Sequence, residues 1–261
     1  TIEEIGGGFP TSGYIGSTEL DGKLYTIGDN QINEIDLVAR TITPLAPTSG
    51  SLPGATTNGP GYTTGTDIFT YRGRLGIVVD RLIYFSAVGD VTRWDVAELI
   101  EGAAYVLGGG VQGLRFGEAI RAVEVTTANN LLICLENSIF QLVGDPITGY
   151  VEQVPSTLDS GASGERAVCT AVLPSGAKDI ALVHSPDGLF ALPSLGAAAN
   201  VSGPVLHAGL TFRRDTRDTY IPQVIREPRD GLLYIFLTRA TAPADGSGST
   251  HVVYHEQEGG Y

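Results

Sequence analysis

The chain has no methionine, two cysteines and one tryptophan among 261 residues. Two cysteines are too few for a disulfide framework in a chain of this length, so Cys134 and Cys169 are expected to be buried thiols in a reducing compartment. No apolar run approaches the roughly 20 residues that cross a bilayer, and the first residues lack the basic region and apolar core of a signal peptide. We therefore expect neither a membrane span nor an export signal.

Positive charge is scarce. Lys and Arg number 16 against 29 Asp and Glu, which gives a formal charge of −13. Binding to the phosphate backbone of nucleic acid depends on Lys and Arg that displace counterions, so a nucleic-acid-wrapping protein is not expected. Two interpretations of the acidic balance stay open: ordinary solubility, or a surface that must not stick to DNA passing close by.

Motifs that carry chemistry are also missing. The triplet Gly108-Gly109-Gly110 lacks the Gly-Lys-Ser/Thr ending of a phosphate-binding loop, and no Gly-x-Ser-x-Gly precedes a helix. His251 and His255 flank a predicted strand, where residues four apart lie ~13 Å from one another and cannot share a zinc ion. We predict no catalytic, cofactor-binding or metal-binding residue, no cofactor, and no enzyme.

What is present is a repeat. Five apolar segments, each followed by a turn and a second apolar segment, begin at Leu24, Leu75, Leu131, Ile180 and Leu232, in steps of 51, 56, 49 and 52 residues. A near-constant period of this size is typical of a repeated supersecondary unit. Apolar strands are predicted upstream at 17–20, 67–71, 120–126, 167–173 and 221–226, and downstream at 40–45 and 150–154. Five aspartates lie in predicted turns: Asp29, Asp80, Asp179, Asp187 and Asp230.

Three or four antiparallel strands per repeat predict an all-β fold, a β-propeller of five antiparallel blades, or six if the termini complete another. A β-sandwich is disfavoured because its strands recur without a longer period. We expect one domain over 1–261, with a short N-terminal arm and long surface loops between blades at 48–66, 103–117, 197–203 and 240–250. One short helix is expected at 95–101, with Leu99 and Ile100 packed inward.

The segment 80–95 reads Asp-Arg-Leu-Ile-Tyr-Phe-Ser-Ala-Val-Gly-Asp-Val-Thr-Arg-Trp-Asp. It resembles a stretch in the β-propeller region of the tail nozzle (tail tubular) proteins of short-tailed bacteriophages. The matching residues are Tyr84, Phe85, Ser86, Gly89, Asp90, Trp94 and Asp95. Physically, one face of the strand can enter the core, Gly89 permits a turn, Asp90 or Thr92 can cap the expected helix, and Trp94 can pin it.

The resemblance implies a structural virion protein, assembled in the host cytoplasm. It would form a ring, a hexamer in the family, around the DNA exit path, touching copies of itself, the adaptor and portal side, and other tail proteins. This chain is shorter than family members, so nozzle, hub and decoration roles stay open. Loops 48–66, 103–117 and 213–218, with Arg213, Arg214 and Arg217, are candidate contacts; the last is equally an exposed loop with local ion pairs. The alternatives are a carbohydrate-active five-bladed propeller enzyme and a cellular protein-binding propeller.

Overall fold

The computed structural model describes residues 16–55, 59–96, 99–110, 114–154, 161–164, 166–171, 180–185, 188–193, 199–200, 220–227, 232–239 and 250–255. Every regular element in these ranges is a β-strand. The chain divides into two compact units: the first contains 1–119 and 144–150, and the second contains 120–143 and 151–261. That residues 1–261 form a single domain therefore remains a prediction.

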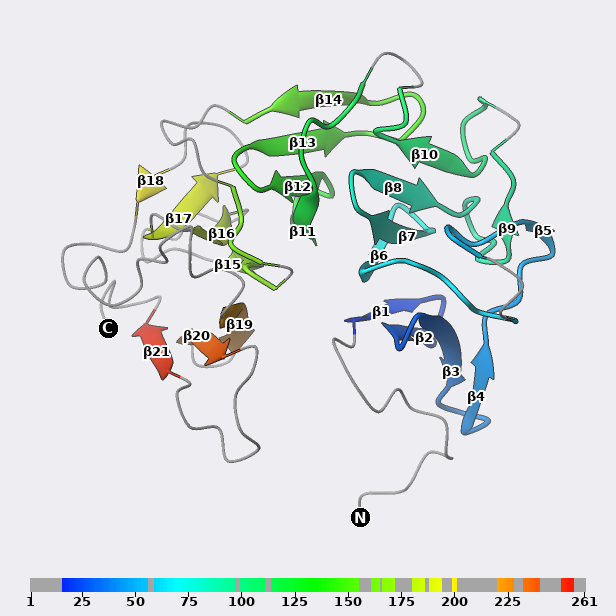
Figure 1. Ribbon diagram of the computed structural model, residues 1–261, viewed down its shortest axis with the longest axis horizontal. Helices are drawn as coiled ribbons and strands as arrows, with labels where there is room; N and C mark the ends of the chain where they lie inside the picture. Colours follow the sequence, from blue (N-terminus) through cyan, green and yellow to red (C-terminus); the bar gives the residue numbers. More distant parts are fainter. Residues whose placement is uncertain are drawn as a thin grey trace. The chain divides into compact units, whose positions relative to one another are not determined.

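The first unit contains two four-stranded antiparallel sheets (Figure 1). The first sheet has the order β1-β2-β3-β4 and consists of β1 (Gly16–Leu20), β2 (Lys23–Gly28), β3 (Gln31–Asp36) and β4 (Thr41–Pro44). The second has the order β10-β8-β7-β6 and consists of β6 (Asp67–Tyr71), β7 (Arg74–Val79), β8 (Leu82–Phe85) and β10 (Tyr105–Leu107). A short parallel pair, β5 (Ser49–Gly50) and β9 (Arg93–Trp94), joins two of the long connections.

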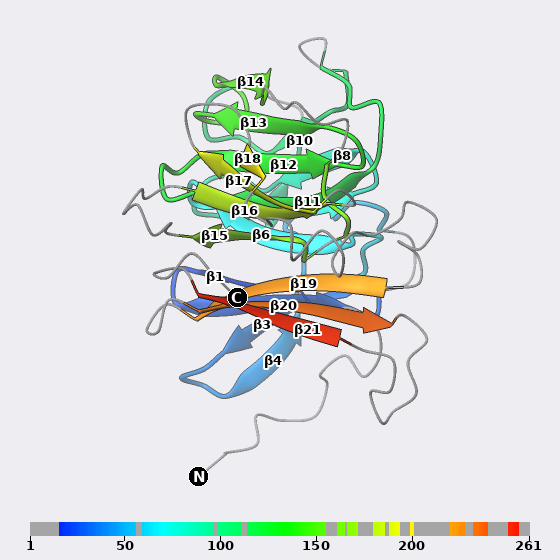
Figure 2. The same cartoon turned by 90° about the vertical axis from the view of Figure 1, so that its left-hand side faces the viewer.

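The second unit continues the series with three further sheets. One consists of β11 (Ile120–Val125), β12 (Leu131–Leu135), β13 (Ile139–Val143) and β14 (Tyr150–Gln153). The next consists of β15 (Val168–Ala171), β16 (Ile180–Ser185), β17 (Gly188–Pro193) and β18 (Ala199–Asn200). The last is a three-stranded sheet of β19 (Tyr220–Glu227), β20 (Leu232–Arg239) and β21 (Thr250–His255), seen together in Figure 2. All five predicted strand pairs are therefore confirmed.

Turn chemistry explains why the strands end where they do. Asp29, Asp80 and Asn129 adopt φ values of 50°, 51° and 57° between paired strands. Aspartate and asparagine tolerate this left-handed conformation better than most residues, as tight hairpins require. The turn prediction is confirmed for Asp29 and Asp80, whereas Asp179, Asp187 and Asp230 lie outside the described residues.

Within each unit, the first strands of successive sheets lie side by side. In the first unit β1 adjoins β6, and in the second β11 adjoins β15, which adjoins β19. Thr70 Oγ1 donates to the Glu19 carbonyl at 2.8 Å, and the Thr170 amide donates to Glu124 Oε1 at 3.0 Å. Leu132 and Cys134 of β12 belong to the same apolar cluster as Ala181 and Val183 of β16, and β12 is buried at all five positions. Within each unit, this adjacency of first strands is typical of neighbouring propeller blades.

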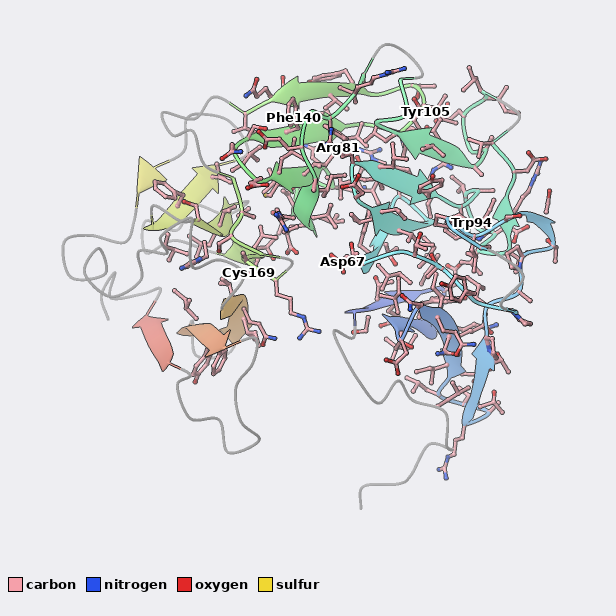
Figure 3. The ribbon with its side chains drawn as sticks, in the orientation of Figure 1. Asp67, Arg81, Trp94, Tyr105, Phe140 and Cys169 are labelled. Carbon is pink, nitrogen blue, oxygen red and sulfur yellow. The ribbon has the colours of Figure 1, made fainter. Side chains whose placement is uncertain are left out.

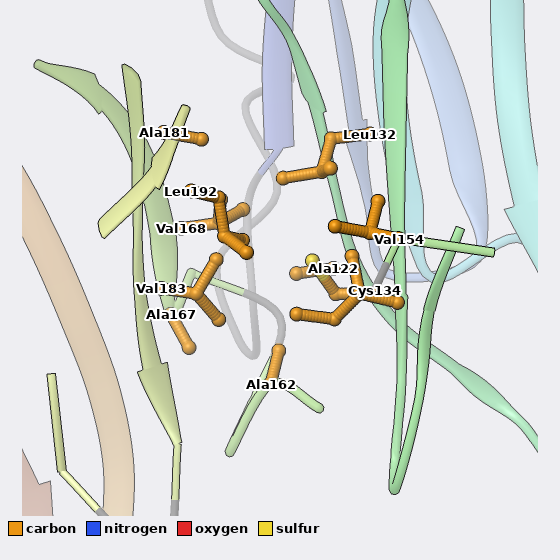
Figure 4. Close-up of a cluster of buried hydrophobic side chains, with 11 residues drawn as sticks. Ala122, Leu132, Cys134, Val154, Ala162, Ala167, Val168, Ala181, Val183 and Leu192 are labelled. Carbon is orange, nitrogen blue, oxygen red and sulfur yellow. The ribbon is translucent and has the colours of Figure 1, made fainter. Parts of the chain in front are cut away.

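The core of the second unit shows how two sheets meet. Figure 4 shows apolar side chains of the β11–β14 sheet facing those of the β15–β18 sheet. Small residues alternate with branched ones, so the sheets interdigitate closely. The cluster consists of Ala122, Leu132, Cys134, Ile139, Val154, Ala162, Ala167, Val168, Ala181, Val183 and Leu192. Both cysteines are free thiols; Cys134 is fully buried, as predicted, whereas Cys169 is half-buried, which corrects its predicted burial.

The two thiols are expected to differ sharply in reactivity. Burial, followed by the nearby Glu124 carboxylate, raises the pKa of Cys134, so little thiolate forms at neutral pH. At pH 8, Cys169 should react with a maleimide at least about a hundredfold faster than Cys134. The Cys134 thiol can react only when local or global unfolding of the second unit exposes it. Peptide mapping by mass spectrometry after a timed pulse measures both rates. Equal labelling in the native protein would contradict the packing of this core.

Two sequence-based expectations are wrong. Of the predicted helix at 95–101, the described residues 95, 96 and 99–101 are irregular or in turns, and Leu99 and Ile100 are 59% and 60% exposed instead of packed inward. A helix this short forms too few hydrogen bonds to offset the unfavourable free energy of its nucleation. The stretches 48–66 and 103–117 are also not plain surface loops. The second supplies strand β10 with buried Tyr105 and Leu107, and the first buries Leu52.

Candidate protein-binding platform

The segment that carries the family-like residues forms the start of a long connection on the first unit. We call residues 86–104, which link β8 to β10, the platform loop; its residues 97 and 98 lie outside the described part of the chain. On β8, Ile83 and Phe85 are buried while Tyr84 is half-buried, which confirms the predicted alternation. Ser86 is buried as well, where its hydroxyl accepts the Leu75 amide at 3.0 Å.

Arg74 holds both ends of the platform loop. Its side chain is fully buried, Nη1 donates to the Ser86 carbonyl at 2.9 Å, and the same nitrogen donates to the Ala103 carbonyl. Nη2 donates to Asp145 Oδ2 at 2.8 Å, within the same unit. Asp145 Oδ1 in turn accepts the Ile147 amide at 2.9 Å. A single guanidinium therefore closes the base of the loop and pairs with a carboxylate that is itself oriented.

Arg74 directly follows the turn between β6 and β7, and an arginine at such a position is ordinarily exposed. Its neighbour Arg72 does occupy the turn, with φ 48° and an exposed side chain. Arg74 instead begins β7 and points inward. No local pattern distinguishes the two arginines, because the partners of Arg74 come from positions 12, 29 and 71 residues away.

The next part of the loop is a tight turn built from the family-like residues. Gly89 has φ 67° and its amide donates to the Gly73 carbonyl at 2.8 Å. Asp90 Oδ1 accepts both the Thr92 hydroxyl at 2.7 Å and the Thr92 amide at 2.9 Å, and these bonds lower the pKa of Asp90. The predicted turn at Gly89 is confirmed. Asp90 caps this turn and not a helix, which corrects its predicted role.

Trp94 fixes the middle of the loop. It is 3% exposed and belongs to the apolar cluster that contains Leu52, Leu75 and Ile77. Its Nε1 donates to the Val91 carbonyl at 2.7 Å, so the indole's polar atom is satisfied. Trp94, labelled in Figure 3, lies on β9 where this strand pairs with β5. The predicted burial is confirmed, but Trp94 anchors a parallel strand pair and not a helix.

The pair β5–β9 clasps the platform loop to the connection between the two sheets. Gly50 pairs with Trp94, the Thr48 amide donates to the Thr92 carbonyl at 2.8 Å, and the two threonine hydroxyls lie 2.9 Å apart. The approach is so close that a Cβ on Gly50 would lie 2.4 Å from the Trp94 carbonyl carbon. Glycine is therefore required here both for its φ of 73° and for space.

Replacing Gly50 with alanine tests the contribution of the β5–β9 pair to stability, and Gly22 provides a matched control. Gly22 has φ 75° but nothing within 4 Å of the position that a Cβ would occupy, so Gly22→Ala tests the backbone conformation alone and should cost about 1 kcal/mol. Gly50→Ala should cost about 2 kcal/mol, because the clasp must also separate. Urea unfolding followed by fluorescence of Trp94, the single tryptophan, measures both. Equal losses would show that the clasp adds nothing.

Above this fixed base, the platform loop exposes apolar side chains. Of the eight large apolar residues described as exposed, four lie here: Val88, Val96, Leu99 and Ile100, at 48%, 42%, 59% and 60%. The Val88 amide donates to the Gly102 carbonyl at 2.9 Å, which sets Val88 beside the 99–102 segment. The same loop also exposes carboxylates at Asp90, Asp95 and Glu101, together with the guanidinium of Arg93. Clustered exposed apolar groups with a polar rim are typical of an interaction surface.

The sequence also hides a buried serine–histidine pair. Ser163 Oγ lies 2.6 Å from His184 Nδ1 and donates to the His184 carbonyl at 3.0 Å, while the two residues are 5% and 0% exposed. The Ser163 amide donates to the same carbonyl, and the His184 amide to that of Ala167. These bonds fasten the 161–167 segment to β16. A hydrolytic nucleophile has to contact its substrate, whereas Ser163 and His184 are both buried. We therefore interpret the pair as a structural contact.

Other predicted positions can be placed only in part. His251 and His255 both lie on β21, opposite Phe236 and Leu232, which confirms the strand. In the part of the chain that the structure describes, no group of three His, Cys, Asp or Glu could hold a metal ion. The same ranges contain no helix long and apolar enough for a bilayer. Arg213, Arg214 and Arg217 lie outside the described residues.

No family model and no curated protein matches this chain. Among solved structures, it is similar to a chain described as the extracellular domain of a hybrid two component system from B. thetaiotaomicron, with a TM-score of 0.52 and 12% identity over 85% of this chain. Together with the series of antiparallel sheets, this likeness shows the fold: the chain is an all-β protein of the β-propeller class.

Further propeller structures resemble it less. The N-terminal domain of Nup159 has a TM-score of 0.45 at 11% identity and is matched over 94% of this chain and 58% of its own. YCF48 from Cyanidioschyzon merolae has a TM-score of 0.39 at 11% identity, over 90% of this chain and 70% of its own. The chain spans 26% of the length of the first protein named above. At these identities the likeness concerns the fold alone, and the number of blades stays a prediction.

Proposed function

We propose that this chain is a structural propeller that acts through protein–protein contact, of the kind found in the tails of short-tailed bacteriophages. The observation that carries the proposal is the platform loop. Its base is closed by Arg74, its middle is clasped by β5–β9, and its apolar side chains stay exposed. Because these contacts fix the base and the β5–β9 part of the loop, less conformational entropy is lost there when a partner binds, which suits assembly.

The resemblance to tail nozzle proteins supports the finer part of the proposal. The residues that carry it, among them Tyr84, Gly89, Asp90 and Trp94, are the residues that build the platform loop and its base. In this role the chain forms a ring with copies of itself around the path of exiting DNA and contacts neighbouring tail proteins in the virion. Its formal charge of −13 suits a wall past which phosphate must move without binding.

Fractionation of particles tests this function. The chain should co-purify with intact virions through a density gradient, and class averages of the detached tails should show several copies around the central axis. A strictly monomeric protein found only outside particles would contradict the proposal. A host-encoded protein-binding propeller could carry the same platform, and the absence of the chain from particles, together with a cellular partner, would favour that alternative.

A further inference from the structure

We infer that the platform loop receives a polypeptide segment of another protein, one whose apolar side chains are flanked by lysine or arginine. The inference rests on the proposed function, since it names the chemistry of a partner for the same surface. It concerns the exposed residues Val88, Val96, Leu99 and Ile100, and the rim formed by Asp90, Asp95 and Glu101.

The exposed apolar side chains of the platform loop are concentrated in one short stretch of the chain. Single exposed aliphatic side chains are ordinary on any protein surface. Here four of the eight large apolar residues described as exposed fall between positions 88 and 100, on one loop, while the stretch before it on β8 buries Ile83 and Phe85. Leu99 and Ile100 are exposed although the following Ala103 and Ala104 are buried. Their exposure leaves apolar area that a partner can remove from water.

The charge around these side chains specifies the partner further. The exposed charged groups described between 88 and 101 are the three rim carboxylates and Arg93, so the rim carries a net negative charge. Its negative sign agrees with that of the whole chain, at −13. Two platforms facing each other would bring like charges together, which opposes a symmetric pairing of two copies. A cationic, apolar segment from a different protein satisfies both features at once.

Binding of synthetic peptides to the full chain tests the inference. The probe is a fluorescent peptide of about 18 residues that alternates leucine and lysine in an amphipathic pattern. A leucine–glutamate peptide and a serine–lysine peptide of equal length are the matched controls. The wild-type chain should bind the leucine–lysine peptide at least about tenfold more tightly than either control. Raising the salt from about 50 to 500 mM should weaken this binding severalfold.

Paired variants locate the site. Leu99→Ser combined with Ile100→Ser should weaken binding by at least about tenfold, because both apolar groups are removed. Both side chains are more than half exposed, so the fold should be retained, which Trp94 fluorescence verifies. Leu37→Ser combined with Val38→Ser removes a similar exposed pair, 54% and 93%, from the turn after β3 and should leave binding unchanged.

Three results would overturn the inference. The first is equal binding by the platform variant and the control variant, which would place the peptide elsewhere on the acidic surface. The second is equal affinity for the serine–lysine peptide, which would show that charge accounts for the binding without any apolar contribution. The third is self-association of the wild-type chain in sedimentation that the platform variant abolishes, which would make a second copy the occupant. Failure here with the chain still present in virion rings would leave the proposed function standing.

Discussion

Replacing Arg74 with methionine should lower the free energy of unfolding by about 3–5 kcal/mol. The substitution leaves the Asp145 carboxylate, 11% exposed, without its 2.8 Å partner, and it removes the donors to the Ser86 and Ala103 carbonyls. Methionine fills most of the arginine's volume, so the loss reports the missing charge and hydrogen bonds more than a cavity. Both ends of the platform loop should also exchange amide hydrogens faster.

Arg121→Met is the matched control for this loss. Arg121 Nη2 lies 3.4 Å from Glu136 Oε2, but both side chains are about one-third exposed, so its ion pair should contribute less than ~1 kcal/mol. Urea unfolding followed by Trp94 fluorescence and circular dichroism compares the two variants. Adding Asp145→Leu to Arg74→Met should recover part of the stability, because it removes the orphaned charge. An Arg74 variant as stable as the Arg121 variant would contradict the role assigned to this buried arginine.

Gly161→Ala should destabilise the second unit by about 4 kcal/mol or more. The Gly161 amide donates to the Glu136 carbonyl at 3.1 Å, and the next amide donates to the Leu135 carbonyl at 3.0 Å. A Cβ at this glycine would lie 1.8 Å from the Leu135 carbonyl oxygen. Because the obstacle is backbone of the buried strand β12, no side chain can move aside, and the segment must leave the β12–β13 turn.

The effect should reach the serine–histidine pair and the neighbouring core. Once the 161–167 segment shifts, the bond between Ser163 and His184 is lost, and Cys134 in the adjoining cluster should become reactive towards maleimide. Gly117→Ala is the control, since nothing lies within 4 Å of the position its Cβ would occupy. Denaturant unfolding and the thiol pulse are measured on both. A stable Gly161→Ala protein with unreactive Cys134 would show that the close approach does not constrain the fold.

The strand framework could be predicted because it depends on local patterns. Apolar runs with turn residues between them determine the hairpins, and Asp29 and Asp80 adopt the positive φ that their turns require. The repeat then predicts how the hairpins group into sheets, because each copy of a repeated supersecondary element has to bury one apolar face against a neighbouring copy. The alternation of Ile83 and Phe85 with Tyr84 is local in the same sense and is confirmed.

The platform could be predicted only in part, because its structure depends on distant partners. The segment 95–101 has helix-forming residues, but the pairing of Trp94 with Gly50, 44 positions away, sets the backbone before it on a strand path. Similarly, β10 joins its sheet through pairing with β8, although its neighbours in sequence are rich in glycine. Arg74 illustrates the same limit, since its burial depends on three carbonyl or carboxylate groups that no local pattern announces.

The residues in 80–95 that resemble tail nozzle proteins are also residues that shape the platform loop in the structure. Gly89, Asp90 and Trp94 belong to the family-like string, and the structure gives each a physical task in shaping the platform loop. Turn, cap and anchor residues of this kind depend on their spacing, since Asp90 bonds to Thr92 and Trp94 bonds to Val91 within the same short stretch.

An electron cryomicroscopy map of the assembled virion tail is the decisive experiment for the proposed role of the platform loop. We expect density for several copies of this propeller around the DNA path, with Leu99 and Ile100 of each copy covered by a basic segment of a neighbouring protein. A tail that lacks the chain, or one in which both side chains face open solvent in every copy, would refute that role.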